Sequence, residues 1–221
     1  NIKYYSKNLR TWMQPDKRHV NPTHLPAKAW VQYQPLGVVG IITPWNYPLL
    51  LAISPLICAL AAGNRAMLKM SSFTPKTGEI LKRALGEAFS EDQVAVITGG
   101  GIVSDAFSRL PFNQMTFTGS TNVGRTVMAA AAENLTPVLL ELGGKSPAII
   151  HESVPMQDAA LRIALGKGWN AGQTCVAPDY VFVPKGKTLE FVAAMKGAVA
   201  KMYPTMLNNP DYTSIVNSKQ Y

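Results

Sequence analysis

The 221-residue chain has few cysteines, few charged residues and no long apolar run. Its two cysteines, Cys58 in an apolar stretch and Cys175 after a glycine turn, make neither a disulfide framework nor a zinc site, so we expect no metal. They favour a reducing, cytoplasmic compartment, and no signal-peptide pattern opens the chain. The apolar stretch of residues 47–62 is interrupted by Ser54 and Pro55 and is shorter than the ~20 residues of a membrane span. It therefore predicts a buried helix.

Charged residues make up only 15% of the chain, but basic ones dominate and the net charge is +8. The lysines and arginines are scattered singly, without a basic run or interleaved aromatics, which argues against nucleic-acid binding. A phosphate-bearing cofactor needs only a few lysines and one helix N-terminus, so the charge is compatible with nucleotide binding. The 47% hydrophobic content indicates a globular protein.

The first 29 residues are polar and contain several prolines, which predicts the end of a helix near Met13 followed by a connector. From Trp30 we expect an edge strand over 30–34, and then strands alternating with helices. The expected strands are 38–42, 65–70, 93–97, 114–118 and 136–141, and the helices are 48–62, 75–89, 102–108 and 121–133. This βαβ rhythm predicts a doubly wound, mostly parallel, Rossmann-like sheet over residues 30–142.

A second βαβ-like series follows Gly143-Gly144, so we place a domain boundary near residues 142–144. It comprises strand 147–151, helix 156–170, strand 179–184 and helix 187–201. The last twenty residues have the character of a loop. Residues 143–221 are thus expected to form part of a second α/β domain, the catalytic one.

A glycine loop over residues 117–124 follows a predicted strand and opens a helix, where free N–H groups and the helix dipole favour a phosphate. Gly119 and Gly124 also have P-loop spacing, but Arg125 replaces the lysine that a P-loop NTPase needs. The structural alternative is a turn in which the glycines only relieve steric crowding.

A thiolate nucleophile needs a base and oxyanion donors, and the sequence offers candidates for both. Cys175, taken alone, has the inert core residue as its alternative. Glu141 closes an apolar strand, where burial would raise its pKa toward that of a general base; the alternative is a surface carboxylate. Asn46 follows a predicted parallel strand, where α/β sheets bind ligands, although an Asx turn or an N-cap would explain it equally. Lys69, also at a strand end, is by default solvated.

Five motifs taken in order resemble the aldehyde dehydrogenase superfamily, over roughly residues 30–200. The stretch 172–180 is most similar to its class 3 and coniferyl aldehyde dehydrogenase branch. The motifs are Pro44-Trp45-Asn46-Tyr47-Pro48, Leu68-Lys69, Phe117-Thr118-Gly119-Ser120-Thr121, Glu141-Leu142-Gly143-Gly144-Lys145-Ser146-Pro147 and Gly172-Gln173-Thr174-Cys175.

The resemblance implies NAD(P)-dependent oxidation of an aldehyde to its acid. Cys175 attacks the carbonyl, its own N–H and the Asn46 side chain hold the oxyanion, and Glu141 activates the water that hydrolyses the thioester. It further implies that Lys69 contacts the adenosine ribose, that the glycine loop covers the pyrophosphate and that Trp45 lines the cofactor cleft. The residues expected to contact the cofactor are Thr43, Pro44, Trp45, Lys69, Ser72, Gly119, Ser120, Thr121, Asn122, Val123, Gly124 and Leu142.

Two departures from the family pattern qualify this expectation. NAD-preferring members often carry a glutamate where this chain has Ser72, and without its repulsion of a 2′-phosphate we predict use of NADP, with NAD also possible. The downstream Glu-x-Phe-Gly-Pro segment is absent. A non-catalytic dinucleotide-binding fragment therefore remains the rival hypothesis. The resemblance suggests an aromatic or medium-chain aldehyde and, for the full-length protein, a homodimer or higher homo-oligomer.

Overall fold

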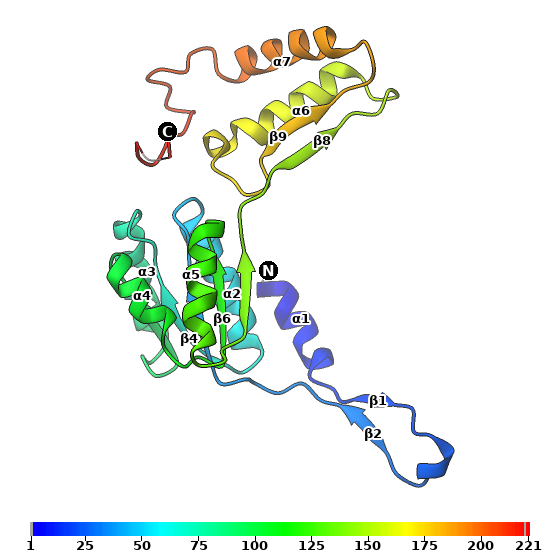
Figure 1. Cartoon of the computed structure of the whole chain (residues 1–221), viewed down its shortest axis with the longest axis vertical. Coiled ribbons are helices and arrows are strands. Elements are labelled where there is room, and N and C mark those ends of the chain that lie inside the picture. Colours follow the sequence, from blue (N-terminus) through cyan, green and yellow to red (C-terminus); the bar gives the residue numbers. More distant parts are fainter. Residues whose placement is uncertain (1, 219) are drawn as a thin grey trace. The chain divides into compact units, whose positions relative to one another are not determined.

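The computed structural model describes residues 2–218 and 220–221 as two compact units, Asn1–Glu141 and Leu142–Tyr221 (Figure 1). The first unit contains α1 (Ile2–Trp12), β1 (Asp16–Arg18), β2 (Ala29–Val31), β3 (Val38–Ile42), α2 (Pro48–Ala61), β4 (Arg65–Lys69), α3 (Pro75–Ala88), β5 (Val94–Ile97), α4 (Gly101–Ser108), β6 (Gln114–Thr118), α5 (Thr121–Ala132) and β7 (Val138–Glu141). The second contains β8 (Ser146–Ile149), α6 (Met156–Gly168), β9 (Pro178–Phe182) and α7 (Thr188–Met202).

Five parallel strands form the sheet of the first unit, in the order β5-β4-β3-β6-β7. The chain builds outward from β3 to β5, then returns to the other side of β3 for β6 and β7. This is the doubly wound α/β arrangement, so the predicted fold class is confirmed. The apolar run of β3 fits its central position, because only Val38, its first residue, is exposed.

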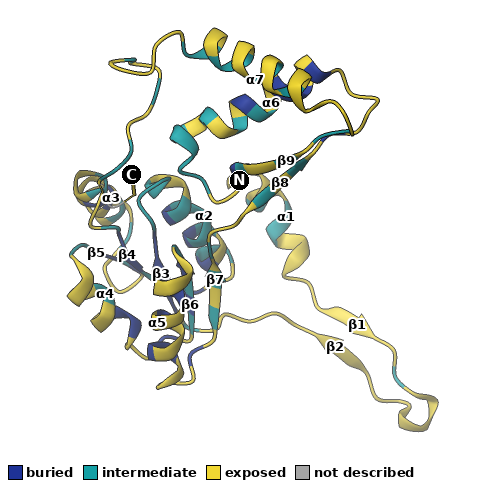
Figure 2. Ribbon diagram, turned by 45° about the horizontal axis from the view of Figure 1, so that its top comes forward, coloured by how far each residue is buried: buried dark blue, intermediate teal, exposed yellow. Residues whose placement is uncertain are grey.

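Helices cover both faces of this sheet, and Figure 2 shows the buried residues gathered in the sheet and on the helix sides that face it. On one face, Val39 and Ile41 share a core cluster with Leu56 of α2 and Leu81 of α3. On the opposite face, α5 contacts α4, β6 and β7. Because successive side chains of β3 point to opposite faces of the sheet, this strand contributes to two separate layers of the core.

The apolar helix predicted for residues 47–62 is α2, but it is buried on one side only. Ala52, Leu56 and Ala59 are buried, whereas Leu49 and Leu50 are 57% and 58% exposed. The helix begins with Pro48, a favoured first residue because proline lacks the N–H that would have no helical acceptor there. Within residues 2–218 and 220–221, no helix is long and apolar enough to cross a membrane.

Residues 29–31 form an antiparallel pair with β1 and do not join the main sheet, so the edge strand expected over 30–34 is shorter and lies elsewhere. The predicted helix end near Met13 is confirmed by α1, which ends at Trp12. All six residues of the β1–β2 pair are exposed, and no hydrophobic layer covers them. The pattern of apolar residues alone does not distinguish a strand of this hairpin from an edge strand of the main sheet.

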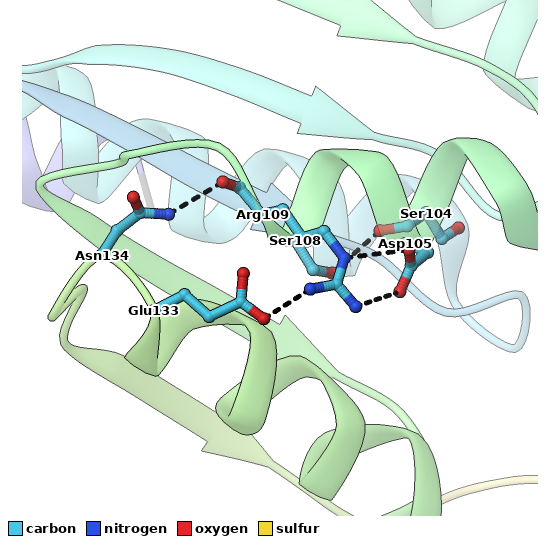
Figure 3. Close-up of polar contacts among 6 residues, drawn as sticks. All are labelled: Ser104, Asp105, Ser108, Arg109, Glu133 and Asn134. Carbon is cyan, nitrogen blue, oxygen red and sulfur yellow. Dashed lines mark hydrogen bonds and ion pairs between the residues drawn. The ribbon is translucent and has the colours of Figure 1, made fainter.

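An ion cluster joins the ends of α4 and α5 (Figure 3). Arg109 donates to Asp105 on its own helix at 3.1 Å and to Glu133 at 2.6 Å, and its backbone carbonyl accepts from the Asn134 amide at 2.8 Å. These two carboxylates raise the pKa of Arg109. Because the charged side chains are about half exposed, solvent screens the pairs, and they orient the helix ends more than they stabilise the fold.

The second unit is a parallel β8–β9 pair covered by α6 and α7. Its core is small, with buried Ile150, Met156 and Ala159 packed against partly buried residues such as Val181 and Phe191. The helix expected over 156–170 ends at Gly168, because Asn170 and Ala171 have left-handed backbone angles inside the 3₁₀ turn Trp169–Gly172. As expected, residues 203–218 and 220–221, the described part of the segment after α7, have neither helix nor strand.

We predict that Gly40→Ala destabilises the first unit. A Cβ at Gly40 would lie 2.6 Å from the Phe112 ring, which is buried and packs on Phe107 at a centroid distance of 4.9 Å. Since the ring cannot move cheaply, we expect a loss of about 1–3 kcal/mol in the free energy of unfolding, measured by urea denaturation. The control is Gly86→Ala, on an open side of α3, which should gain about 0.5–1 kcal/mol. Equal effects of the two substitutions would contradict the packing argument.

Candidate active site

The strands β3 and β6 are neighbours in the sheet. The connection after β3 leads to β4 on one side of this pair, whereas the connection after β6 leads to β7 on the other side. Ligands of open α/β sheets bind at the carboxyl ends of such strands. Ile42 of β3 pairs with both Lys69 of β4 and Phe117 of β6, and Thr118 pairs with Glu141 of β7. The register therefore gathers Thr43, Lys69, the glycine loop and Glu141 along one edge of the first unit.

Lys69 is buried, with only 2% of its surface exposed, so the solvated side chain that its position suggests by default is wrong. Its ammonium donates to the carbonyls of Met70 at 2.8 Å and Gly99 at 2.7 Å. Burial lowers its pKa, because desolvation penalises the charged form. An ammonium has three protons, so one remains for a ligand beyond these two carbonyls.

Buried Thr43 begins the loop after β3 and is tied to the same strand end. Its N–H donates to the carbonyl of Lys69 at 3.1 Å. Pro44, Trp45 and Asn46 follow and are half-buried, whereas Ser72, in the loop after β4, is exposed. The residues expected at the cofactor thus come from the loops that end adjacent strands.

The glycine loop is shaped by its own side chains. A Cβ at Gly119 would lie 2.5 Å from the Phe117 ring, so the steric reason for this glycine is real. The N–H of Gly119 donates to the carbonyl of Glu141, and the hydroxyl of Ser120 caps α5 by accepting from Val123. Gly124 is buried and bonds to the carbonyl of Ser120.

These bonds leave fewer donors than the cradle of a P-loop has, which weighs against the NTPase alternative. Thr121 and Asn122 are the first two residues of α5, and both are exposed. Residues at this position have N–H groups without a helical acceptor, at the positive end of the helix dipole. An anion can therefore still be bound here.

Asn46 borders an open, mostly apolar groove of about 1080 Å³ between α1 and α2. The other lining residues include Tyr47, Leu50, Ile53 and Ile57. The N-cap position of α2 is Tyr47, so the N-cap role that would have explained Asn46 does not hold. An amide beside an apolar groove suits a ligand with one polar carbonyl and a hydrophobic body.

Glu141 ends β7 at the edge of the sheet, and its side chain is exposed. The burial that we expected for this carboxylate is therefore not found. Edge position explains the difference, because Leu139 of the same strand is also 50% exposed although its sequence predicts a buried strand. The position of Glu141 is nonetheless fixed, since its carbonyl accepts from Gly119 at 3.0 Å.

Cys175 is an exposed, free thiol in the second unit, which contradicts the inert core alternative. The N–H of Ala177 donates to the carbonyl of Thr174 at 3.1 Å, so Cys175 lies in a tight turn. Two residues further toward the N-terminus lie three consecutive residues in left-handed conformation, with φ of 51° at Asn170, 54° at Ala171 and 76° at Gly172. Such strain in residues other than glycine is often found at functional sites.

The first unit thus brings together the expected cofactor residues, Asn46 and Glu141, whereas Cys175 and the half-buried Leu142 belong to the second unit. That Cys175 meets Asn46 and Glu141 stays a prediction. Across the described part of the chain, no cluster of three or more His, Cys, Asp or Glu residues could hold a metal ion.

The sequence profile of the aldehyde dehydrogenase family matches residues 1–221. The chain belongs to this family. It is 60% identical to a probable coniferyl aldehyde dehydrogenase of Pseudomonas aeruginosa over 99% of its own length and 46% of that protein's length. It also resembles the substrate-bound structure of Staphylococcus aureus AldH, with a TM-score of 0.93 and 41% identity over 99% of this chain and 48% of that one.

A third relative, and the second of known structure, is the Mycobacterium tuberculosis aldehyde dehydrogenase complexed with NAD⁺. The TM-score is 0.82 and the identity 35%, over 91% of this chain and 41% of that one. The chain spans about half the length of the family members that it matches.

We predict that the buried ammonium of Lys69 makes stability depend on pH. The folded state releases this proton at a lower pH than the unfolded chain, whose lysine has the ordinary pKa of 10.5. Between the two pKa values the unfolded state binds more protons, so the free energy of unfolding rises with pH. Relative to Lys69→Met, the wild type should therefore gain stability as the pH approaches 10.5, as measured by urea denaturation.

The matched control is Lys82→Met, which removes an exposed lysine from α3. Its stability difference from the wild type should not change over the same pH range. At neutral pH, Lys69→Met should already be less stable by about 1–3 kcal/mol, because two carbonyls lose their donor. A pH-independent difference for Lys69→Met would show that the lysine is not desolvated.

Proposed function

We propose that the protein oxidises an aldehyde to the carboxylic acid with a nicotinamide dinucleotide, through a covalent intermediate on Cys175. The observation that carries this proposal is an exposed thiol in a tight turn, three residues after a strained left-handed segment, in a chain of the aldehyde dehydrogenase family. Buried structural cysteines lack this combination of access and local strain.

The residues along the sheet edge fit a dinucleotide. The N–H groups of Thr121 and Asn122 at the start of α5 suit a pyrophosphate, and the third proton of the Lys69 ammonium suits a ribose hydroxyl. Glycine is needed at position 119, because a side chain there would collide with the Phe117 ring. When bound, the nicotinamide ring supplies an acceptor for hydride. The related M. tuberculosis enzyme in complex with NAD⁺ supports this class of cofactor.

The chemical roles follow from the groups that each residue offers. The Cys175 sulfur forms a bond to the aldehyde carbon, and the carbonyl oxygen becomes an oxyanion held by the Cys175 N–H and the Asn46 amide. Loss of hydride from this carbon leaves a thioester. Glu141 takes a proton from the water that attacks the thioester, and the thiolate leaves with release of the acid.

The groove beside Asn46 supports an aldehyde with an apolar body. Leucine and isoleucine side chains make up much of its lining, and Asn46 and Lys3 are among the residues that add polar groups to it. The 60% identity to a probable coniferyl aldehyde dehydrogenase favours an aromatic aldehyde, with a medium-chain one as the second choice. We further propose a cytoplasmic homodimer or higher homo-oligomer for the full-length protein, on the family resemblance alone.

We predict that Cys175→Ala in the full-length protein reduces aldehyde oxidation to background and leaves dinucleotide binding unchanged. The thiol is the only group that forms the covalent intermediate, whereas the cofactor is held by the first unit. Oxidation is followed as growth of NAD(P)H absorbance with an aromatic aldehyde, and binding by fluorescence titration. Cys58→Ala is the control and should retain turnover, because this cysteine lies on α2 beside Tyr5. Turnover by Cys175→Ala would refute the mechanism.

We predict that Ser72→Glu shifts cofactor preference from NADP toward NAD. Ser72 is exposed in the loop that follows the strand of Lys69, so a carboxylate there would repel a 2′-phosphate. The ratio of kcat/KM for NADP to that for NAD should fall at least roughly tenfold, since opposed like charges cost several kcal/mol. Ser72→Gln, of equal size but neutral, should change the ratio far less. An equal fall of this ratio in both variants would show that the size of the side chain, and not its charge, causes the effect.

A further inference from the structure

The left-handed turn before Cys175 needs support from its surroundings. Asparagine and glycine tolerate positive φ, but Ala171, at 54°, pays a steric penalty through its Cβ. Three such residues in a row are not a standard helix end, and α6 has already finished at Gly168. Within the turn, the N–H of Gln173 donates to the carbonyl of Asn170 at 3.0 Å and the Asn170 amide donates to the carbonyl of Gln173 at 3.3 Å, and contacts outside the turn add to this support.

Gln173 provides these outside contacts. Its side-chain amide group donates to the carbonyl of Asn170 at 3.0 Å and to the carbonyl of Ser214 at 3.2 Å. Its side-chain oxygen accepts from the N–H of Val216 at 3.0 Å. One half-buried side chain thus joins the left-handed turn to a loop segment more than forty residues further along the chain.

The restraint continues from Gln173 to the nucleophile through the backbone. The N–H of Thr174 donates to the carbonyl of Gly172 at 2.8 Å, and the next turn, from Thr174 to Ala177, contains Cys175. On the other side, a Cβ at Gly144 would lie 3.3 Å from the carbonyl of Cys175, so the backbone has little room there. The position of Cys175 therefore depends on the geometry that Gln173 enforces two residues earlier.

We propose that Gln173 is a positioning residue, which holds the Cys175 turn in its reactive geometry by tying it to residues 214–216. The proposal rests on the proposed nucleophilic role of Cys175. It assigns a function to the segment after residue 202, which carries no predicted site residue. Gln173 itself contacts backbone groups and needs no contact with the substrate for this role.

The test is Gln173→Met in the full-length protein, which keeps the length of the side chain and removes these three hydrogen bonds. The rate of the first turnover, per active site counted from the burst of NAD(P)H, should fall by about 10- to 100-fold, as expected when a reacting group is slightly misplaced. The Kd of the dinucleotide should not change, and the KM of the aldehyde should change much less than kcat. A purely structural role would lower the number of active sites, not the rate per site.

Two companion variants sharpen the outcome. Gln173→Asn keeps the same polar groups but is one methylene shorter, so its side chain should no longer reach Ser214 and Val216. We expect this variant to slow the first turnover as well. If Gln173→Met does not fold, the rate of Gln173→Asn tests the positioning role. Asn209→Ala is the control, because Asn209 makes hydrogen bonds to Thr205 and Asp211 within the same segment, and its rate should stay within about twofold of the wild type.

The outcomes separate this proposal from the proposed function. A wild-type rate per site in folded Gln173→Met or Gln173→Asn overturns the positioning role, provided that Cys175→Ala is inactive. Turnover by Cys175→Ala instead overturns the nucleophilic role on which the positioning depends. A slowed rate in Asn209→Ala equal to that of Gln173→Met would also overturn the proposal, because any disturbance of the segment would then suffice.

Discussion

The pairing of β3 with β4 on one side and β6 on the other is the constraint on which the candidate site depends. Because all five strands are parallel and in continuous register, their carboxyl ends lie along one edge. The loops that leave this edge must satisfy their own backbone groups, and they do so with one another. Thr43 bonds to Lys69, and Gly119 to Glu141. Residues up to 98 positions apart are thus fixed by sheet hydrogen bonds rather than by loop sequence.

The same register places a buried lysine at the carboxyl edge of the sheet. Residues 66–69 of β4 pair with both neighbouring strands, so Lys69 ends an interior strand whose backbone hydrogen bonds fix its position. The chain compensates the buried ammonium with two carbonyls, one of them from Gly99, after the neighbouring strand. A desolvated ammonium with a proton to spare interacts more strongly with a ligand than a hydrated one would. The packing of the sheet and the proposed binding of a cofactor therefore make the same demand on this residue.

The sequence predicts most of the elements, because their apolar periods and their glycine and proline boundaries are local signals. It predicts the central strand 38–42 and the strand 114–118 with their observed bounds. It misplaces residues 30–34, since a hairpin strand and a sheet edge share one pattern. The local pattern also leaves Lys69 solvated by default, and it places Glu141 in a buried strand end. Burial depends on what lies beside a strand end, and pairing partners are not visible in a local pattern.

The contacts that hold Cys175 are harder to predict from the sequence, because they combine a strained backbone with a loop that is distant along the chain. The second unit has a small core around Ile150, Met156 and Ala159, yet it keeps Ala171, four residues before the proposed nucleophile, in an unfavourable conformation. The Gly172-Gln173-Thr174-Cys175 motif is visible in the sequence. Nothing in the sequence indicates that residues 214–216 are the partner of this turn. A few hydrogen bonds to that loop replace the apolar packing that would otherwise fix the turn. Hydrogen bonds serve this purpose well, because they define a geometry without covering the thiol, which has to stay accessible for the proposed reaction.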